Sequence, residues 1–155
     1  MKFTIKLLAN FWNKSPIINI YLNKEQILQI NNFDSNKEKL ISFEKDIKDH
    51  KNELTIHREG KTLEDTMVTN GNIEKDSIVQ IQEITIDKIN IKPLLTTALF
   101  YPVYPEPWLT EQKAINQTPP ESYGHTTSLH HNGNWRLKFE VPIHIWFFQN
   151  LNVSI

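Results

Sequence analysis

The 155-residue sequence contains no cysteine, which excludes disulfide frameworks, cysteine-based zinc sites and thiol nucleophiles. Glycine occurs only four times, and no apolar run approaches the ~20 residues that a membrane-spanning helix needs. Neither sign of charge dominates: 17 basic and 18 acidic side chains leave no electrostatic case for nucleic acid or an anionic membrane surface. The remaining composition, 39% hydrophobic, is typical of one soluble globular domain that can bury its own core.

Catalytic motifs are missing as well. The sequence contains no phosphate-binding P-loop, no G-x-G-x-x-G motif and no G-x-S-x-G motif. Carboxylates are plentiful, but none lies in a motif that pairs an acid with a base. We therefore expect a protein that is not an enzyme.

The composition of the chain changes near residue 92. Most charged side chains lie before this point, whereas seven of the eight prolines and four of the six histidines follow it. The later part contains few periodic segments and would form little core by itself. We therefore expect a β-sandwich core at 1–91 and, packed on the same domain, an extended Pro/aromatic-rich C-terminal extension at 92–155.

Short segments in which apolar and polar side chains alternate occur along the whole chain. This period of two residues is the pattern of a half-buried strand. The clearest segments are 3–7, 18–22, 54–57, 78–91 and 135–141. No helix-length periodic segment interrupts them, so the predicted fold class is all-β: an antiparallel β-sandwich of jelly-roll type, with further strands around 135–148.

Local signals predict where the strands bend or turn. In the segment that begins at residue 78, the apolar parity shifts between Ile81 and Ile84, which predicts a β-bulge. The pair 87–88 predicts a tight turn or a kink in the same segment. Asn70 and Gly71 predict another turn, because both residue types tolerate positive φ.

The loop 58–76 concentrates hard oxygen donors between two predicted strands. It contains five carboxylates and two amide side chains against three basic groups. Calcium takes roughly 6–8 oxygen ligands in an undemanding geometry, so the loop suits a calcium site with Asp65, Asn70 and Asp76 as ligands. The alternative on the same spacing is a solvated acidic loop with Asx-turns.

Residues 17–91 resemble the calcium-dependent carbohydrate-binding modules of the xylan-binding type, small jelly rolls appended to polysaccharide-degrading enzymes. The match lies in the order of elements: the strand and hairpin at 17–26, the strand at 54–57, the Asp/Asn-bearing loop, and Asp76 leading into strands at 78–81 and 84–89. The resemblance implies a bound calcium whose open positions take sugar hydroxyls, with Asp76 the best match and Asp65 or Asn70 less close. It implies a non-catalytic, calcium-assisted module that binds a polysaccharide or cell-surface glycan.

A Pro-aromatic tract occupies residues 100–108. Its prolines fix an extended, polyproline-like backbone from which Tyr101, Tyr104 and Trp108 can present flat faces to sugar rings. The same tract can instead pack on its own sandwich or act as an arm that docks on a neighbouring protein. Residues 142–155 form an unusually apolar segment that is either core or an interface.

The alternative function is structural. A small β domain, a Pro-aromatic tract and an Asn-rich chain without cysteine also resemble accessory proteins of tailed bacteriophages. This resemblance implies a virion protein, a capsid decoration or tail component, that docks on neighbouring subunits through its Pro-aromatic arm. Residues 1–10 interleave apolar and polar side chains, so we expect synthesis in the cytoplasm without a signal peptide, with the virion surface as one destination.

Overall fold

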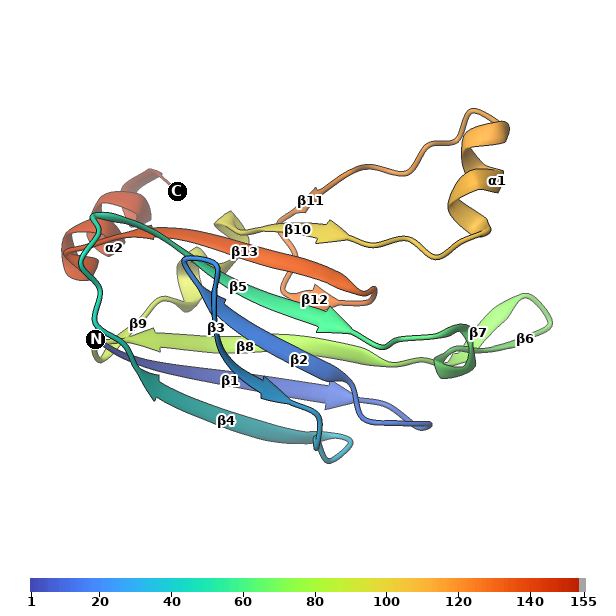
Figure 1. Cartoon of the computed structure of the whole chain (residues 1–155), viewed down its shortest axis with the longest axis horizontal. Coiled ribbons are helices and arrows are strands. Elements are labelled where there is room, and N and C mark those ends of the chain that lie inside the picture. Colours follow the sequence, from blue (N-terminus) through green and yellow to red (C-terminus); the bar gives the residue numbers. More distant parts are fainter. Residues whose placement is uncertain (154–155) are drawn as a thin grey trace.

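The computed structural model describes residues 1–153 and shows two antiparallel sheets packed face to face as a sandwich (Figure 1). The first sheet has the order β12 (Ser128–Leu129), β8 (Ile78–Ile86), β1 (Lys2–Asn10), β4 (Lys37–Glu44), and β9 (Ile89–Asn90) pairs with β8. The second sheet has the order β11 (Tyr123–Gly124), β10 (Leu99–Pro102), β13 (Gly133–Glu140), β5 (Lys51–Glu59), β2 (Ile17–Leu22), β3 (Glu25–Ile30). The prediction of an antiparallel β-sandwich is therefore confirmed.

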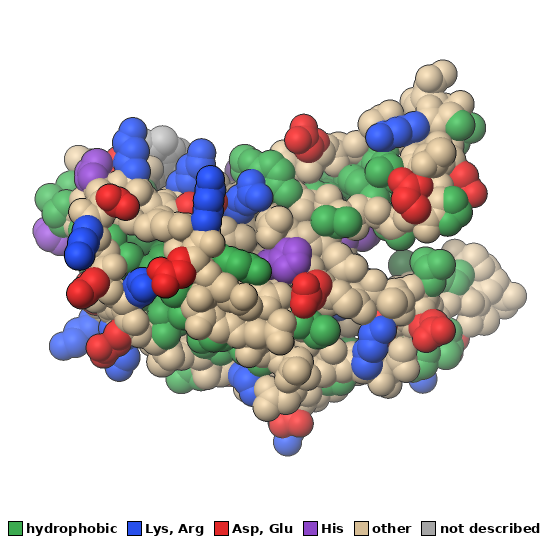
Figure 2. Space-filling model, viewed as in Figure 1, with side chains coloured by type: hydrophobic (Ala, Val, Ile, Leu, Met, Phe, Trp, Pro, Cys, Tyr) green, Lys and Arg blue, Asp and Glu red, His purple; other side chains and the backbone are tan. Residues whose placement is uncertain are grey.

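The remaining elements lie outside the two sheets. They are the hairpin β6 (Met67–Thr69) and β7 (Asn72–Lys75), the 3-10 helices η1 (Leu63–Asp65) and η2 (Lys92–Thr97), and the α-helices α1 (Trp108–Ala114) and α2 (Ile143–Val153). Residues 103–122, here termed the arm, carry α1 away from the sandwich, and Figure 2 shows a hollow between the arm and the β6–β7 hairpin. Within the described part of the chain, no helix has the length and apolarity to cross a membrane.

The hydrophobic core lies between the sheets because alternate side chains of each strand point inward. In β1, Phe3, Ile5 and Leu7 are fully buried, whereas the residues between them are partly exposed. The facing sheet contributes the buried side chains Ile18, Ile20, Leu54, Ile56, Trp135, Leu137 and Phe139. Full burial of each large apolar side chain stabilises the fold by about 1.5–3 kcal/mol, so this alternation accounts for the pairing of the sheets.

The predicted bulge is present in β8. Lys6 of β1 pairs with Glu83 and Leu7 pairs with Ile81, which leaves Gln82 without a partner on β1. The extra residue keeps Ile81 and Ile84 buried on the same face although they are three positions apart.

Two-residue turns close three hairpins. They lie at 23–24, 70–71 and 87–88, between β2 and β3, β6 and β7, and β8 and β9. Both residues of each pair have positive φ, the conformation in which a two-residue turn matches the twist of its strands. The turns predicted at 70–71 and 87–88 are confirmed.

The C-terminal part of the chain is not an extension, and this prediction was wrong. Strand β13 lies between β10 and β5, so residues after 92 supply interior strands of the second sheet. The change in composition near residue 92 suggested a separate segment. Composition is a local property, however, whereas the order of strands in a sheet depends on pairing between residues that are distant in the sequence. The strands predicted around 135–148 end at Glu140, where β13 stops.

Helix α2 replaces the rest of that predicted strand. Its buried residues Ile143 and Trp146 are three positions apart, which is the spacing of one helix face. Trp146 packs edge-on against Phe139, with ring centroids 6.3 Å apart. The sequence of this segment is almost continuously apolar, so periodicity could not separate a helix from a strand.

Candidate functional site

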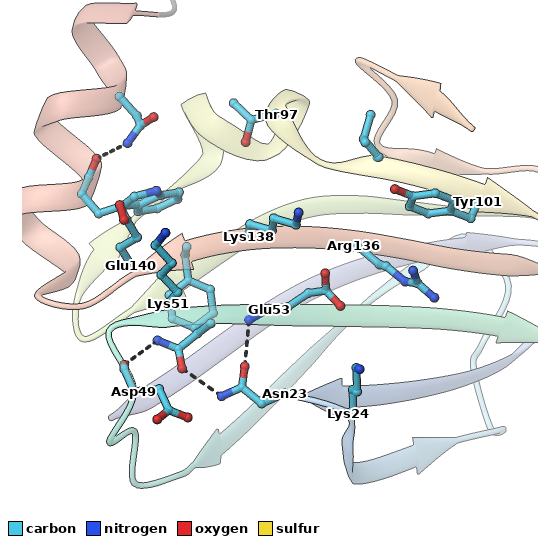
Figure 3. Close-up of a pocket in the computed structure, with 15 residues that line it drawn as sticks. Asn23, Lys24, Asp49, Lys51, Glu53, Thr97, Tyr101, Arg136, Lys138 and Glu140 are labelled. Atoms are coloured by element: carbon cyan, nitrogen blue, oxygen red, sulfur yellow. Dashed lines mark hydrogen bonds between the residues drawn. The ribbon is translucent and has the colours of Figure 1, made fainter. Parts of the chain in front are cut away.

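A groove of about 870 Å³ crosses the outer face of the second sheet, the face turned away from the first sheet (Figure 3). Its lining residues come from strands β5, β10 and β13, the turn at 23–24, the loop before β5, and helices η2 and α2. Arg136 and Lys138 reach the groove because they alternate along β13 with buried core residues. The strand pattern that builds the core therefore also places polar side chains in the groove.

Charged side chains of both signs line the groove. In the register of β13 with β5, Lys138 lies opposite Glu53 and Glu140 lies opposite Lys51. Lys24 adds a third ammonium group from the turn between β2 and β3. None of these three ammonium groups forms an ion pair or hydrogen bond with another residue in the range 1–153, so their donors are available to a ligand.

Tyr101 is the predicted stacking residue that lines this groove. Carbon Cζ of Arg136 lies 4.8 Å from the centroid of the Tyr101 ring, a cation–π contact that holds the guanidinium over the ring. Arg136 therefore covers one face of the ring. The guanidinium and the ring together give the groove a flat surface with hydrogen-bond donors at its edge.

A row of planar polar side chains crosses the same face beside the groove. The strand register aligns Asn134, His57, Asn19 and Gln29 on β13, β5, β2 and β3. His57 Nδ1 donates to Asn134 Oδ1 at 2.8 Å, and Gln29 Nε2 donates to Asn19 Oδ1 at 2.8 Å. These bonds fix the side-chain planes, so the row is an ordered polar surface.

The other two predicted stacking residues lie in the arm. The Tyr104 and Trp108 ring centroids are 5.5 Å apart, and Trp108 is 41% exposed. The Tyr104 hydroxyl donates to the Pro120 carbonyl oxygen (2.6 Å) and accepts from the Tyr123 hydroxyl (2.9 Å). Burial and the Tyr123 hydroxyl raise the pKa of Tyr104 above its ordinary value. The structure thus brings Tyr104 and Trp108 together and places Tyr101 in the groove.

Asp65, one of the predicted calcium ligands, is 1% exposed and lies in η1. Its carboxylate accepts hydrogen bonds from the Thr62 backbone N–H (2.8 Å) and the Asn13 side-chain amide (3.3 Å), and Lys14 Nζ lies 3.4 Å away. Burial alone would raise the pKa of Asp65, but these contacts hold it below its ordinary value. Asp65 therefore ties the loop after β1 to the turn of η1.

Asp76 and Asn70, the other predicted ligands, have different surroundings. Asp76 Oδ1 accepts hydrogen bonds from the Thr66 hydroxyl and the Ser77 backbone N–H, and lies 2.8 Å from Lys61 Nζ. Burial would raise the pKa of Asp76, but these three contacts lower it. Asn70 is exposed in the turn at the tip of the β6–β7 hairpin.

Sequence reasoning missed Arg58, a buried cation that interacts electrostatically with Asp65 and Asp76. Its Nη1 donates to the carbonyl oxygens of Ser77 (2.8 Å) and Leu129 (2.7 Å), and its Nη2 donates to Ser77 Oγ (2.5 Å). Burial lowers the pKa of Arg58 to about 10, against the opposing effect of both carboxylates, so it stays charged at neutral pH. The sequence signal was the position of Arg58, which follows Leu54 and Ile56 at intervals of two residues. A side chain at this spacing lies on the inward face of β5.

In this arrangement the three predicted ligands do not fit a calcium site. Calcium takes about 6–8 oxygens, whereas the Asp65 carboxylate is enclosed and Asp76 is already paired with a lysine. Asn70 lies in the turn between β6 and β7. Among the described residues, no three His, Asp or Glu side chains converge as a metal site. The ligand assignment itself stays a prediction.

Comparisons with known proteins rest on the fold, because the sequence matches no protein-family model and no curated protein. One similar solved structure is vCBM60 in complex with galactobiose, with a TM-score of 0.53 and 12% identity over 88% of this chain and 96% of that chain. The other is the selenomethionine form of vCBM60, with a TM-score of 0.55 and 10% identity over 87% of each chain.

The chain shares the fold of vCBM60. The second structure comes from work on circular permutation as an evolutionary link between two families of calcium-dependent carbohydrate-binding modules. At 10–12% identity the similarity shows the fold alone. The expected likeness to a calcium-dependent carbohydrate-binding module is confirmed at the level of fold, whereas the bacteriophage resemblance gains no support.

Proposed function

We propose that this chain is a non-catalytic carbohydrate-binding module and that its sugar site is the groove on the second sheet. The groove carries the proposal because it combines free donors, a carboxylate and an aromatic ring in one open depression. Its volume, about 870 Å³, lies within the range of roughly 300–1,000 Å³ that ligand sites span. The similar vCBM60 structure in complex with galactobiose supports the class of ligand.

The chemistry of the groove suits sugar hydroxyls, which both donate and accept hydrogen bonds. Lys24, Lys138 and Arg136 can donate to hydroxyl oxygens, and the Glu53 carboxylate can accept from hydroxyl groups. The apolar C–H face of a sugar ring can pack beside Tyr101, as apolar surfaces pack on aromatic rings. No proton transfer or bond cleavage enters this account, so we propose binding without catalysis.

The test is binding to a glycan panel that includes galactobiose, followed by titration of each retained glycan. We expect Arg136→Ala to weaken binding by about 10-fold or more, the usual cost of losing a hydrogen bond to a charged group. The matched control is Lys37→Ala, which removes an exposed cation from β4 on the other sheet. Retention of no glycan, or equal affinities for Arg136→Ala and Lys37→Ala, would contradict the proposal.

The arm offers a second surface for stacking. Trp108 is partly exposed beside Tyr104, as the predicted stacking role requires. In the same titrations, a loss caused by Trp108→Ala and not by Arg136→Ala would move the sugar site from the groove to the arm. The stacking roles of Tyr101, Tyr104 and Trp108 are part of this proposal.

The proposed sugar binding requires neither calcium nor a role in a virion. Asp65 and Asp76 are engaged by protein donors, so no step of sugar binding is routed through a metal ion. Exposed Val103 and Ile115 on the arm are compatible with docking on a neighbouring subunit. The virion role and the destination on a virion surface nevertheless stay predictions.

A further inference from the structure

Four chain segments meet at the end of the sandwich that carries the β6–β7 hairpin. They are the loop after β1, the segment that follows β5, the residues that precede β8, and the loop between β12 and β13. Ionised side chains of these segments, together with Arg58 near the end of β5, form a set that we term the loop cluster: Lys14, Arg58, Lys61, Asp65 and Asp76. Three cations thus accompany two carboxylates.

Arg58 is the buried centre of the loop cluster. Its guanidinium spans two segments, because one nitrogen donates to the carbonyl oxygens of both Ser77 and Leu129. The planar fork of arginine suits several fixed acceptors at once. The hydrogen bonds of the Arg58 side chain therefore link β5 to the residue before β8 and to β12.

Lys61 links the cluster to the loop before β13. Its Nζ lies 2.8 Å from Asp76 Oδ1 and donates to the His130 carbonyl oxygen at 2.6 Å. Its backbone N–H donates to Asn132 Oδ1, and its carbonyl oxygen accepts from Asn132 Nδ2, both at 2.9 Å. The Lys61 side chain is 12% exposed, so its ammonium is held against the protein rather than in bulk water.

Lys14 has the corresponding role at the other carboxylate. Its Nζ lies 3.4 Å from Asp65 Oδ2 and 3.3 Å from the Thr62 hydroxyl oxygen. The neighbouring Asn13 amide and Trp12 Nε1 donate to the side chain and backbone of Asp65. Each carboxylate of the cluster therefore has its own lysine.

We propose that the side-chain cations of the loop cluster neutralise its carboxylates and join its loops, so that this end of the molecule needs no calcium. A calcium ion at Asp76 would be repelled by Lys61, whose Nζ lies 2.8 Å from Asp76 Oδ1, and by Arg58, which interacts electrostatically with the same carboxylate. Protein donors already contact both oxygens of the enclosed carboxylate of Asp65. This proposal does not rest on carbohydrate binding, because it concerns the folded chain alone.

The first test is the melting temperature of the unmodified chain in EDTA and in millimolar calcium chloride. A ligand that binds only the folded state at 100 times its Kd raises the melting temperature of a chain of this size by about 5–10 °C. We expect a shift below about 1 °C. A shift of several degrees that Asp76→Asn abolishes would overturn the proposal.

The second test removes the lysine that pairs with Asp76. We expect Lys61→Met to lower the melting temperature by about 3–8 °C, because it leaves a largely buried carboxylate without its partner. Lys37→Met is the control, since Lys37 is exposed and belongs to β4. Equal melting temperatures for the two variants would show that the ammonium does not stabilise the loops and would overturn the proposal. If Lys61→Met does not fold, Lys14→Met at the more exposed lysine gives the same comparison.

Discussion

At the scale of single residues, the carboxylates of Asp65 and Asp76 couple folding to pH. Contacts in the folded state outweigh burial and keep both pKa values below their ordinary range. The unfolded chain therefore takes up these protons at a higher pH than the folded chain does. The contribution of both residues is present above the unfolded pKa and is lost as the pH falls through the folded values.

We expect the melting temperature to fall as the pH is lowered from about 5 through the ordinary aspartate pKa near 4. Asp65→Asn should melt at a lower temperature near neutral pH, because the Thr62 and Lys14 contacts lose their charged partner. It should also lose less stability in acid than the parent does. Thermal melts across about pH 3–7 measure both effects, and parallel profiles for parent and variant would exclude Asp65 as a source of the acid sensitivity.

At the scale of elements, the β8 bulge shows how one extra residue preserves a buried face. Ile81, Ile84 and Ile86 are all buried, although strict alternation would place Ile81 and Ile84 on opposite faces. Gln82 has no partner on β1, and this extra residue brings Ile81 and Ile84 to the same face.

The position of the bulge predicts an asymmetry between two deletions. Removal of Gln82 leaves Ile81, Glu83 and Ile84 in regular alternation, so we expect the chain to fold with its apolar side chains still buried. Removal of Thr85 makes Ile84 and Ile86 adjacent and forces one of them toward solvent, which costs about 1.5–3 kcal/mol or more. Urea unfolding of both deletion variants measures the difference. Equal losses would show that the bulge itself is required.

Local periodicity predicted β1, β2, β5, β8 and β13, because consecutive residues of a half-buried strand alternate between its two faces. The segments 3–7, 18–22, 54–57, 78–86 and 135–140 are all in strands. The loop cluster left no such record, because the contact of Arg58 with Leu129 joins residues 71 positions apart. The groove likewise depends on the order of β10, β13 and β5, which neither charge nor period indicates.

At the scale of the whole molecule, α2 closes the end of the sandwich opposite the hairpin (Figure 1). Trp146 is 6% exposed and covers Phe139, so the apolar C-terminal segment is core for at least this residue. The sequence alone did not decide whether the apolar segment 142–155 belongs to the core or forms an interface. The burial of Trp146 favours the core for this residue.

We expect Trp146→Ala to lower the free energy of unfolding by about 3–5 kcal/mol, the usual cost of truncating a buried tryptophan. Phe148→Ala is the control, because Phe148 lies on the same helix and is 62% exposed. Its effect should stay within about 0.5 kcal/mol. Urea denaturation followed by circular dichroism gives both values, and similar losses for the two variants would mean that α2 does not pack through Trp146.

The β6–β7 hairpin pairs with neither sheet, and its turn at Gly71 has no atom within 4 Å of the position of a Cβ. A peptide epitope or a fluorescent-label sequence inserted between Asn70 and Gly71 would therefore enter open solvent and leave both ladders intact. The hairpin tip thus provides an attachment position for a label that lies outside both sheets and outside the hydrophobic core.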